Sequence, residues 1–157
     1  MKETLYTIPL TDAFHANDEC PLCFVEREVE QDLLDLVLGS SSSYMESDMR
    51  EMTDKAGFCR AHFKKMFDYG NSLGNAWILK TMYMRHIEEM DKEFKNFKPD
   101  SVQRSGLFKK ANTSSNSIVD WINKRESTCF ICDSVNKTFN AYMKTFFTMY
   151  ELSLIHI

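Results

Sequence analysis

The sequence has few residues that break regular structure, and it has no long apolar run. Its 157 residues include 5 glycines and 3 prolines, a scarcity that argues against a turn-rich β fold, whereas 12 phenylalanines and 10 methionines suit packing between helices. No apolar stretch approaches the ~20 residues that cross a bilayer. The N-terminal segment lacks the apolar region and the cleavage site of a secretory signal. We therefore expect an all-α protein of the cytoplasm.

Several function classes lack their usual sequence signals. The net charge of −4 and the pI near 5.6 argue against a broad nucleic-acid surface, which would need clustered lysine and arginine. There is no glycine-rich phosphate loop, and no nucleophile has an identifiable base and orienting group. The sequence therefore predicts no nucleic-acid partner, no membrane partner and no catalytic residue, and it does not identify a protein partner or an oligomeric state.

What the chain does contain is helical periodicity. Between Pro21 and Leu38 apolar residues recur at three- and four-residue steps, Pro21 suits a first helical turn and Gly39 suits a helix end. Similar patterns predict helices over about 44–55, 59–69, 73–97, 117–122 and after 132. The apolar stripe of the longest helix is predicted to face the core and consists of Trp77, Ile78, Met82, Ile87, Met90, Phe94 and Phe97.

Two short motifs carry the chemistry. Cys20-Pro21-Leu22-Cys23 and Cys59-Arg60-Ala61-His62 each place two soft metal ligands three positions apart at a predicted helix start. Thiolates at a helix N-terminus are stabilised by its free N–H groups and positive dipole end. Together the two pairs complete the four ligands of a structural zinc site. We therefore predict one Zn²⁺ bound by Cys20, Cys23, Cys59 and His62.

Other uses of these cysteines stay open. A thiol redox enzyme or sensor could use Cys-X-X-Cys as a dithiol, although such oxidoreductases usually have a βαβ context that this sequence lacks. An iron–sulfur centre, another metal and buried inert thiols are further alternatives. A regulator that binds a small ligand between helices is a third function class.

The sequence also contains an internal repeat. Cys129-Phe130-Ile131-Cys132 opens a predicted helix as Cys20–Cys23 does, and a similar apolar pattern follows each pair. Because the repeat stops after its first helix, we predict a truncated second module in which Cys129 and Cys132 form an incomplete second metal site. The predicted organisation is a zinc-pinned helical module (1–97), a linker (98–117), the start of the second module (118–151) and a non-native tail (152–157).

The tail prediction rests on Leu152-Ser-Leu-Ile-His-Ile157, which looks like a translation of the transposase end sequence used in sequencing adapters. We expect the native sequence to stop near Glu151.

The chain resembles an uncharacterised bacterial family of helical proteins, a domain-of-unknown-function group with CPxC, GFCxxH and CxxC motifs. The resemblance covers most of residues 1–151 and rests on Glu19–Cys23, Ser43–Glu46, Thr53–Phe63 and Cys129–Cys132. It implies paired Cys/His motifs and longer relatives with a further Cys-X-X-His, and it implies no established activity. Some members are named as substrate-binding proteins of ABC transporters, but this chain has no signal or lipobox to support that role.

Taken together, these patterns predict a helical bundle whose helix N-termini are pinned by a Cys3His metal site. The leading function is a non-enzymatic, zinc-stabilised scaffold or interaction module, with thiol redox chemistry as the alternative.

Overall fold

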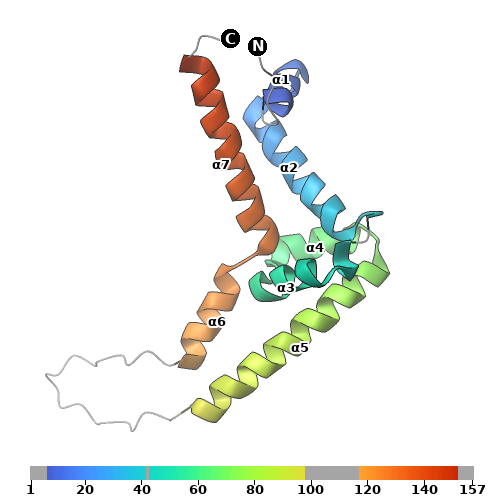
Figure 1. Ribbon diagram of the computed structural model, residues 1–157, viewed down its shortest axis with the longest axis vertical. Coiled ribbons are helices and arrows are strands. Elements are labelled where there is room, and N and C mark those ends of the chain that lie inside the picture. Colours follow the sequence, from blue (N-terminus) through green and yellow to red (C-terminus); the bar gives the residue numbers. More distant parts are fainter. Residues whose placement is uncertain (1–6, 42, 98–116, 152–157) are drawn as a thin grey trace, which may run out of the picture.

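The computed structural model describes residues 7–41, 43–97 and 117–151, in which the chain is all-α, as predicted. Figure 1 shows the helices from the two ends of the chain in the upper part of the molecule, the longest helix in the lower part and short helices between them. Over these ranges there is no β-strand, and no helix is both long and apolar enough to cross a membrane. The elements are α1 (Thr7–His15), α2 (Pro21–Leu38), the 3-10 helix η1 (Ser43–Met45), α3 (Ser47–Ala56), α4 (Arg60–Asp68), α5 (Ser72–Asn96), α6 (Ser117–Ser127) and α7 (Phe130–Glu151).

Helix α2 has the bounds predicted from its local signals. Pro21 occupies the first turn, where an N–H would have no partner within the helix, and the N–H of Gly39 donates to a carbonyl of the last turn at 2.8 Å. Not every apolar residue of the helix belongs to its buried face: Leu34 is buried, whereas Leu36 is 44% exposed. The buried residues of α2 are Val25, Val29, Leu34, Val37 and Leu38.

Helices α2 and α7 pack against each other in opposite directions (Figure 1). They contribute to one apolar core, with Val25 and Val29 from α2 and Ile131 and Val135 from α7. Burial of each such side chain stabilises the fold by about 1.5–3 kcal/mol. Helix α1 lies against both partners, so the upper part of the molecule is a three-helix layer. This packing places the start of α7 beside the segment that joins α3 to α4.

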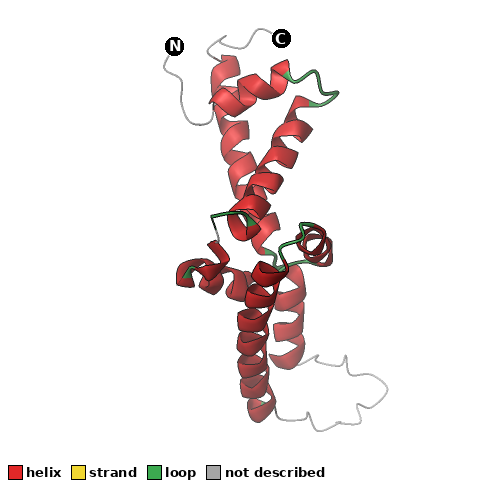
Figure 2. Cartoon of the chain, turned by 90° about the vertical axis from the view of Figure 1, so that its right-hand side faces the viewer, coloured by secondary structure: helices red, strands yellow, loops and turns green. Residues whose placement is uncertain are grey.

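The lower part of the molecule is built on α5, which packs against α3 and α6 (Figure 2). At 25 residues α5 rises about 37 Å, far more than the ten-residue α3 that lies on it. Ile78 and Met82 are buried, whereas Ile87 and Phe94 are 60% and 57% exposed. In the part of the chain that the structure describes, the second half of the predicted stripe is therefore not in the core, which corrects that prediction.

Two further boundaries differ from the sequence patterns. The helix predicted over 44–55 is divided, because Glu46 adopts an extended backbone between η1 and α3. The predicted linker lies outside the described residues except for Ser117, which begins α6, and the predicted tail lies wholly outside them.

The carboxylate of Glu89 and its partner Arg125 link helices α3, α5 and α6. Its carboxylate accepts hydrogen bonds from Arg85 Nε (2.9 Å) and Trp121 Nε1 (3.1 Å) and pairs with Arg125. Arg125 in turn donates from Nη1 to the carbonyl oxygen of Lys55 (2.8 Å) at the end of α3. Burial acts to raise the pKa of Glu89, but the hydrogen bonds from Arg125, Trp121 and Arg85 outweigh it and lower the pKa to about 2. The ionised carboxylate therefore stabilises the junction of α3, α5 and α6.

Substitution Glu89→Gln should lower the free energy of unfolding by about 1–3 kcal/mol at pH 7, because the amide cannot accept the same charge-assisted hydrogen bonds. A carboxyl whose pKa is lowered by folding contributes fully above its usual pKa and loses that contribution as pH falls. The difference between wild type and variant should therefore shrink between about pH 4.5 and pH 2. Urea unfolding at pH 7 and pH 3 measures this, with the exposed neighbour Glu88→Gln as a control that should change little at either pH.

Candidate metal centre

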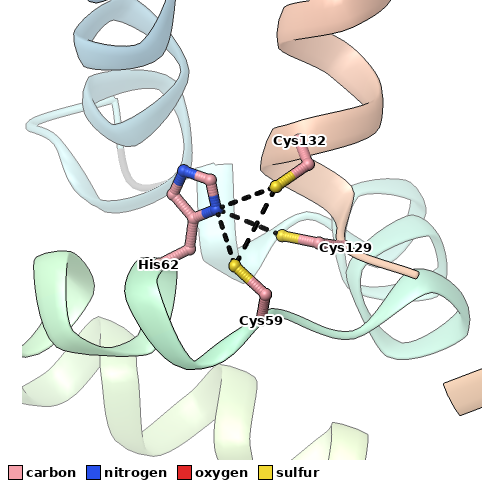
Figure 3. Close-up of side chains that lie close together, drawn as sticks. All are labelled: Cys59, His62, Cys129 and Cys132. Atoms are coloured by element: carbon pink, nitrogen blue, oxygen red, sulfur yellow. Dashed lines mark hydrogen bonds between the residues drawn. The ribbon is translucent and has the colours of Figure 1, made fainter. Parts of the chain in front are cut away.

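Four side chains from the starts of α4 and α7 converge at one point. Cys59 Sγ, Cys129 Sγ and Cys132 Sγ lie 3.2, 3.3 and 3.4 Å from His62 Nδ1, and all four ligand atoms lie within 4.8 Å of one another (Figure 3). We call these four residues the Cys3His cluster. Among the described residues no other group of three or more histidine, cysteine or acidic side chains is gathered in this way.

The first two ligands come from the start of α4. Cys59 is the N-cap residue, with an extended backbone, and His62 lies in the first helical turn. The N–H of Phe63 donates to the carbonyl of Cys59 at 2.9 Å, which fixes the two ligands relative to each other. Gly57 ends α3 with φ 68° and ψ −165°, a conformation that residues with a Cβ rarely adopt. Glycine is thus needed where the chain leaves α3 and turns into the ligand pair.

The other two ligands come from the start of α7 by the same local geometry. Cys129 directly precedes α7, and Cys132 lies in its first turn. The N–H of Asp133 donates to the carbonyl of Cys129 at 2.9 Å, as Phe63 does to Cys59 in the first pair. Both helix N-termini therefore point at the cluster, and their positive dipole ends favour negatively charged sulfur there.

Hydrogen bonds hold the two ligand pairs side by side. The N–H of Phe130 donates to the carbonyl of Gly57 at 2.9 Å, and Thr128 Oγ1 donates to the carbonyl of Ala56 at 2.7 Å. The guanidinium of Arg125 is bonded to the last turn of α3, as described above. The segment before Cys129 is thus attached to the segment before Cys59 without help from the cluster itself.

The cluster fits a tetrahedral metal ion. With metal–sulfur bonds of about 2.3 Å and a metal–nitrogen bond of about 2.0–2.1 Å, two sulfurs lie about 3.8 Å apart and a sulfur and a nitrogen about 3.5 Å. Here Cys59 Sγ and Cys132 Sγ are 3.9 Å apart, and the three sulfur–nitrogen distances are 3.2–3.4 Å. Cys129 is 3% and His62 7% exposed. The four residues present therefore could hold one metal ion with little rearrangement.

The protonation of the thiols depends on whether a cation lies among them. Burial acts to raise the pKa of Cys59, but hydrogen bonds from the backbone and side chain of His62 and from the neighbouring thiols lower it to about 7. Burial, with hydrogen bonds and charge from Cys129 and Cys59, raises the pKa of Cys132 to about 12. Sulfurs this close cannot all be thiolates unless a positive ion compensates them. Without a cation, Cys132 therefore stays protonated at neutral pH.

Glu30 on α2 supports the cluster from outside. His62 Nδ1 faces the three sulfurs, and the opposite ring nitrogen, Nε2, lies 2.7 Å from Glu30 Oε1. Lys65 pairs with the other carboxylate oxygen. Burial acts to raise the pKa of Glu30, but hydrogen bonds from Lys65 and His62 outweigh it and lower the pKa below its usual value. A carboxylate on the far nitrogen of a metal-binding imidazole fixes its tautomer and its orientation.

Sequence patterns did not single out Glu30. It is one of several acidic residues on the polar side of α2, and its spacing from any cysteine or histidine carries no known signal. Only the packing of α2 beside α4 brings it to His62.

Substitution Glu30→Gln should weaken metal binding by about 10–100-fold, because the amide orients the imidazole and raises its basicity less effectively. Competition with a chromophoric chelator measures the affinity. Glu26→Gln is the matched control, since Glu26 lies one turn earlier on the same helix and is exposed. An equal loss of affinity in both variants would rule out the specific role of Glu30.

The structure divides the predicted ligand set. Cys20 and Cys23 are joined to each other by a disulfide at the start of α2. Glu30 follows Cys23 by seven positions, a helical rise of about 10 Å, and neither cysteine of the pair belongs to the gathered group. Cys59 and His62 are gathered, but with Cys129 and Cys132, the pair that the sequence assigned to an incomplete second site.

Fold and site together define an all-α protein with a partly buried Cys3His cluster that could hold a metal ion. A family model covers residues 1–153, and the chain belongs to that family, described as a family of unknown function (DUF6062). No curated protein and no solved structure matches the chain.

Proposed function

We propose that the Cys3His cluster binds one structural Zn²⁺ and that the protein is a non-enzymatic helical scaffold or interaction module. The observation that carries the proposal is the convergence of three cysteine sulfurs and one imidazole nitrogen within 4.8 Å at two helix N-termini. Soft thiolates with imidazole in a tetrahedron are a ligand set typical of zinc.

A structural role is favoured over a catalytic one by the number of ligands. Catalytic zinc sites usually have three protein ligands and keep the fourth position for water or substrate. Here four side chains are in place, so bound zinc would have no open position. The ion would link α4 to α7 and thereby join residues on both sides of segment 98–116.

Under this proposal, the zinc ion links the two modules that the sequence predicts. If 1–97 and 118–151 are a module and the start of its repeat, the ion is shared between them, with one ligand pair from each. We place the protein in the cytoplasm, where the three cysteines of the cluster would stay reduced and available to metal.

Elemental analysis combined with thiol titration tests the proposal. Purified protein should contain about one zinc per chain, and Cys59, Cys129 and Cys132 should resist a thiol reagent until a chelator is added. Protein that is folded and free of metal, with all three thiols reactive, would contradict it. If the protein contained one equivalent of a metal other than zinc, the proposed site would be supported and the proposed identity of the ion would be wrong.

A further inference from the structure

We propose that Cys20 and Cys23 form a thiol–disulfide exchange centre for small thiols, in which Cys23 is the attacked sulfur and Cys20 the leaving group. The proposal is independent of the zinc site, because the Cys3His cluster has four ligands without this pair. The observations that carry it are the disulfide itself, the unequal exposure of its two sulfur-bearing residues and a cavity next to Cys23.

The two cysteines have different surroundings. Cys23 is exposed in the first turn of α2, whereas Cys20 is half-buried at the N-cap position. The backbone N–H of Cys23 donates to Cys20 Sγ at 3.1 Å, and the positive end of α2 lies at the same place. A thiolate on Cys20 is therefore stabilised, and a stabilised thiolate is the better leaving group in disulfide exchange.

A cavity next to Cys23, the exposed residue of the pair, gives a small thiol access to the disulfide. It has a volume of about 280 Å³ and lies between α2 and α7, and its lining includes Cys23, Glu26, Arg27, Glu30, His62 and Cys132. This volume is near the lower end of the range for small-molecule sites. Because both Cys23 and the edge of the Cys3His cluster line the cavity, the exchange centre and the metal site share one approach from solvent.

In the proposed exchange reaction, a small thiol reduces the disulfide between Cys20 and Cys23. A thiolate RS⁻ attacks Cys23 Sγ, the bond between Cys23 and Cys20 breaks, and Cys20 leaves as a thiolate that takes up a proton. A second RS⁻ then attacks the sulfur of the bound thiol, which releases RSSR and the Cys23 thiolate. Two electrons pass from two thiols to the disulfide, and the reverse sequence oxidises the dithiol by RSSR.

Glutathione and its disulfide serve as the probe, used on the metal-loaded full chain. In wild-type protein the Cys20–Cys23 pair should change reversibly between disulfide and dithiol as the glutathione ratio is varied, as followed by alkylation and intact mass. The cluster cysteines should stay unmodified under the bound ion. A pair that remains reduced, or remains oxidised, at every ratio would overturn the proposal.

Two variants test the assigned roles. Cys20→Ser retains an N-cap oxygen, so α2 should still form, and it should accumulate a mixed disulfide on Cys23. Cys23→Ser should form one on the half-buried Cys20 about tenfold more slowly, because access limits the attack. Equal rates, or faster reaction at Cys20, would refute the roles. Metal content of reduced wild type should equal that of both variants, and a second ion that either substitution removes would assign the pair to metal binding instead.

Discussion

Substitution of Cys132 by serine should release the metal ion, whereas substitution of Cys23 by serine should leave it bound. Cys132 Sγ lies 3.4 Å from His62 Nδ1 in the Cys3His cluster, and Cys23 lies about 10 Å of helix away from Glu30, the residue that contacts His62. Serine has the size of cysteine but not its soft thiolate. Loss of one ligand should weaken binding by more than ~100-fold, since even loss of an outer hydrogen-bond partner costs 10–100-fold.

The pair of variants also decides between two ligand sets. Metal content after dialysis against a weak chelator is the readout, with circular dichroism to check that each variant is folded. If Cys23→Ser lost its metal and Cys132→Ser kept it, the ion would be bound by the set that the sequence predicted, Cys20, Cys23, Cys59 and His62. Cys129→Ser should behave as Cys132→Ser does.

Removal of the ion should lower the melting temperature by roughly 8–16 °C. A ligand present at 1,000 times its dissociation constant stabilises the state that binds it by about 4 kcal/mol. For a chain of this size each kcal/mol corresponds to about 2–4 °C. Differential scanning calorimetry with and without a strong chelator measures the shift.

The loss of stability that follows metal removal should appear first near the cluster and only later throughout the fold. Hydrogen exchange should accelerate first at the starts of α4 and α7, where the cluster holds the chain, and later in the apolar core of α2 and α7. Cys132→Ser is the control, because a chain that binds no metal should not respond to the chelator. The same shift in that variant would show that the chelator acts elsewhere.

The helices could be predicted largely because their signals are local. Pro21 at one end and Gly39 at the other fix the bounds of α2, and the apolar period between them indicates its buried face. The buried face of α5 was predicted wrongly because its burial depends on long-range packing and not on local signals. The pattern around Ile87 and Phe94 is helical, but whether such a face is covered depends on how far the neighbouring helices extend along it.

The sequence predicted a Cys3His site, and the group that the structure gathers shares Cys59 and His62 with the predicted ligands but has Cys129 and Cys132 beside them. The chain has three ligand pairs of one form, each at a helix start: Cys20/Cys23, Cys59/His62 and Cys129/Cys132. Any two could complete a tetrahedron, and proximity in the sequence favoured the first two. The arrangement in the structure depends on long-range contacts, such as the hydrogen bond from Phe130 to the carbonyl of Gly57. No spacing rule encodes such a contact.

The distance along the chain between the two halves of the cluster sets the order of events during synthesis. Cys129 follows His62 by 67 residues. At about 5–20 residues per second, a ribosome needs roughly 3–13 s to add them. During this interval only Cys59 and His62 of the Cys3His cluster have been made, and the thiols available to them are those of Cys20 and Cys23. If the cluster binds zinc as proposed, its own ligand set is completed late, after α7 has been made.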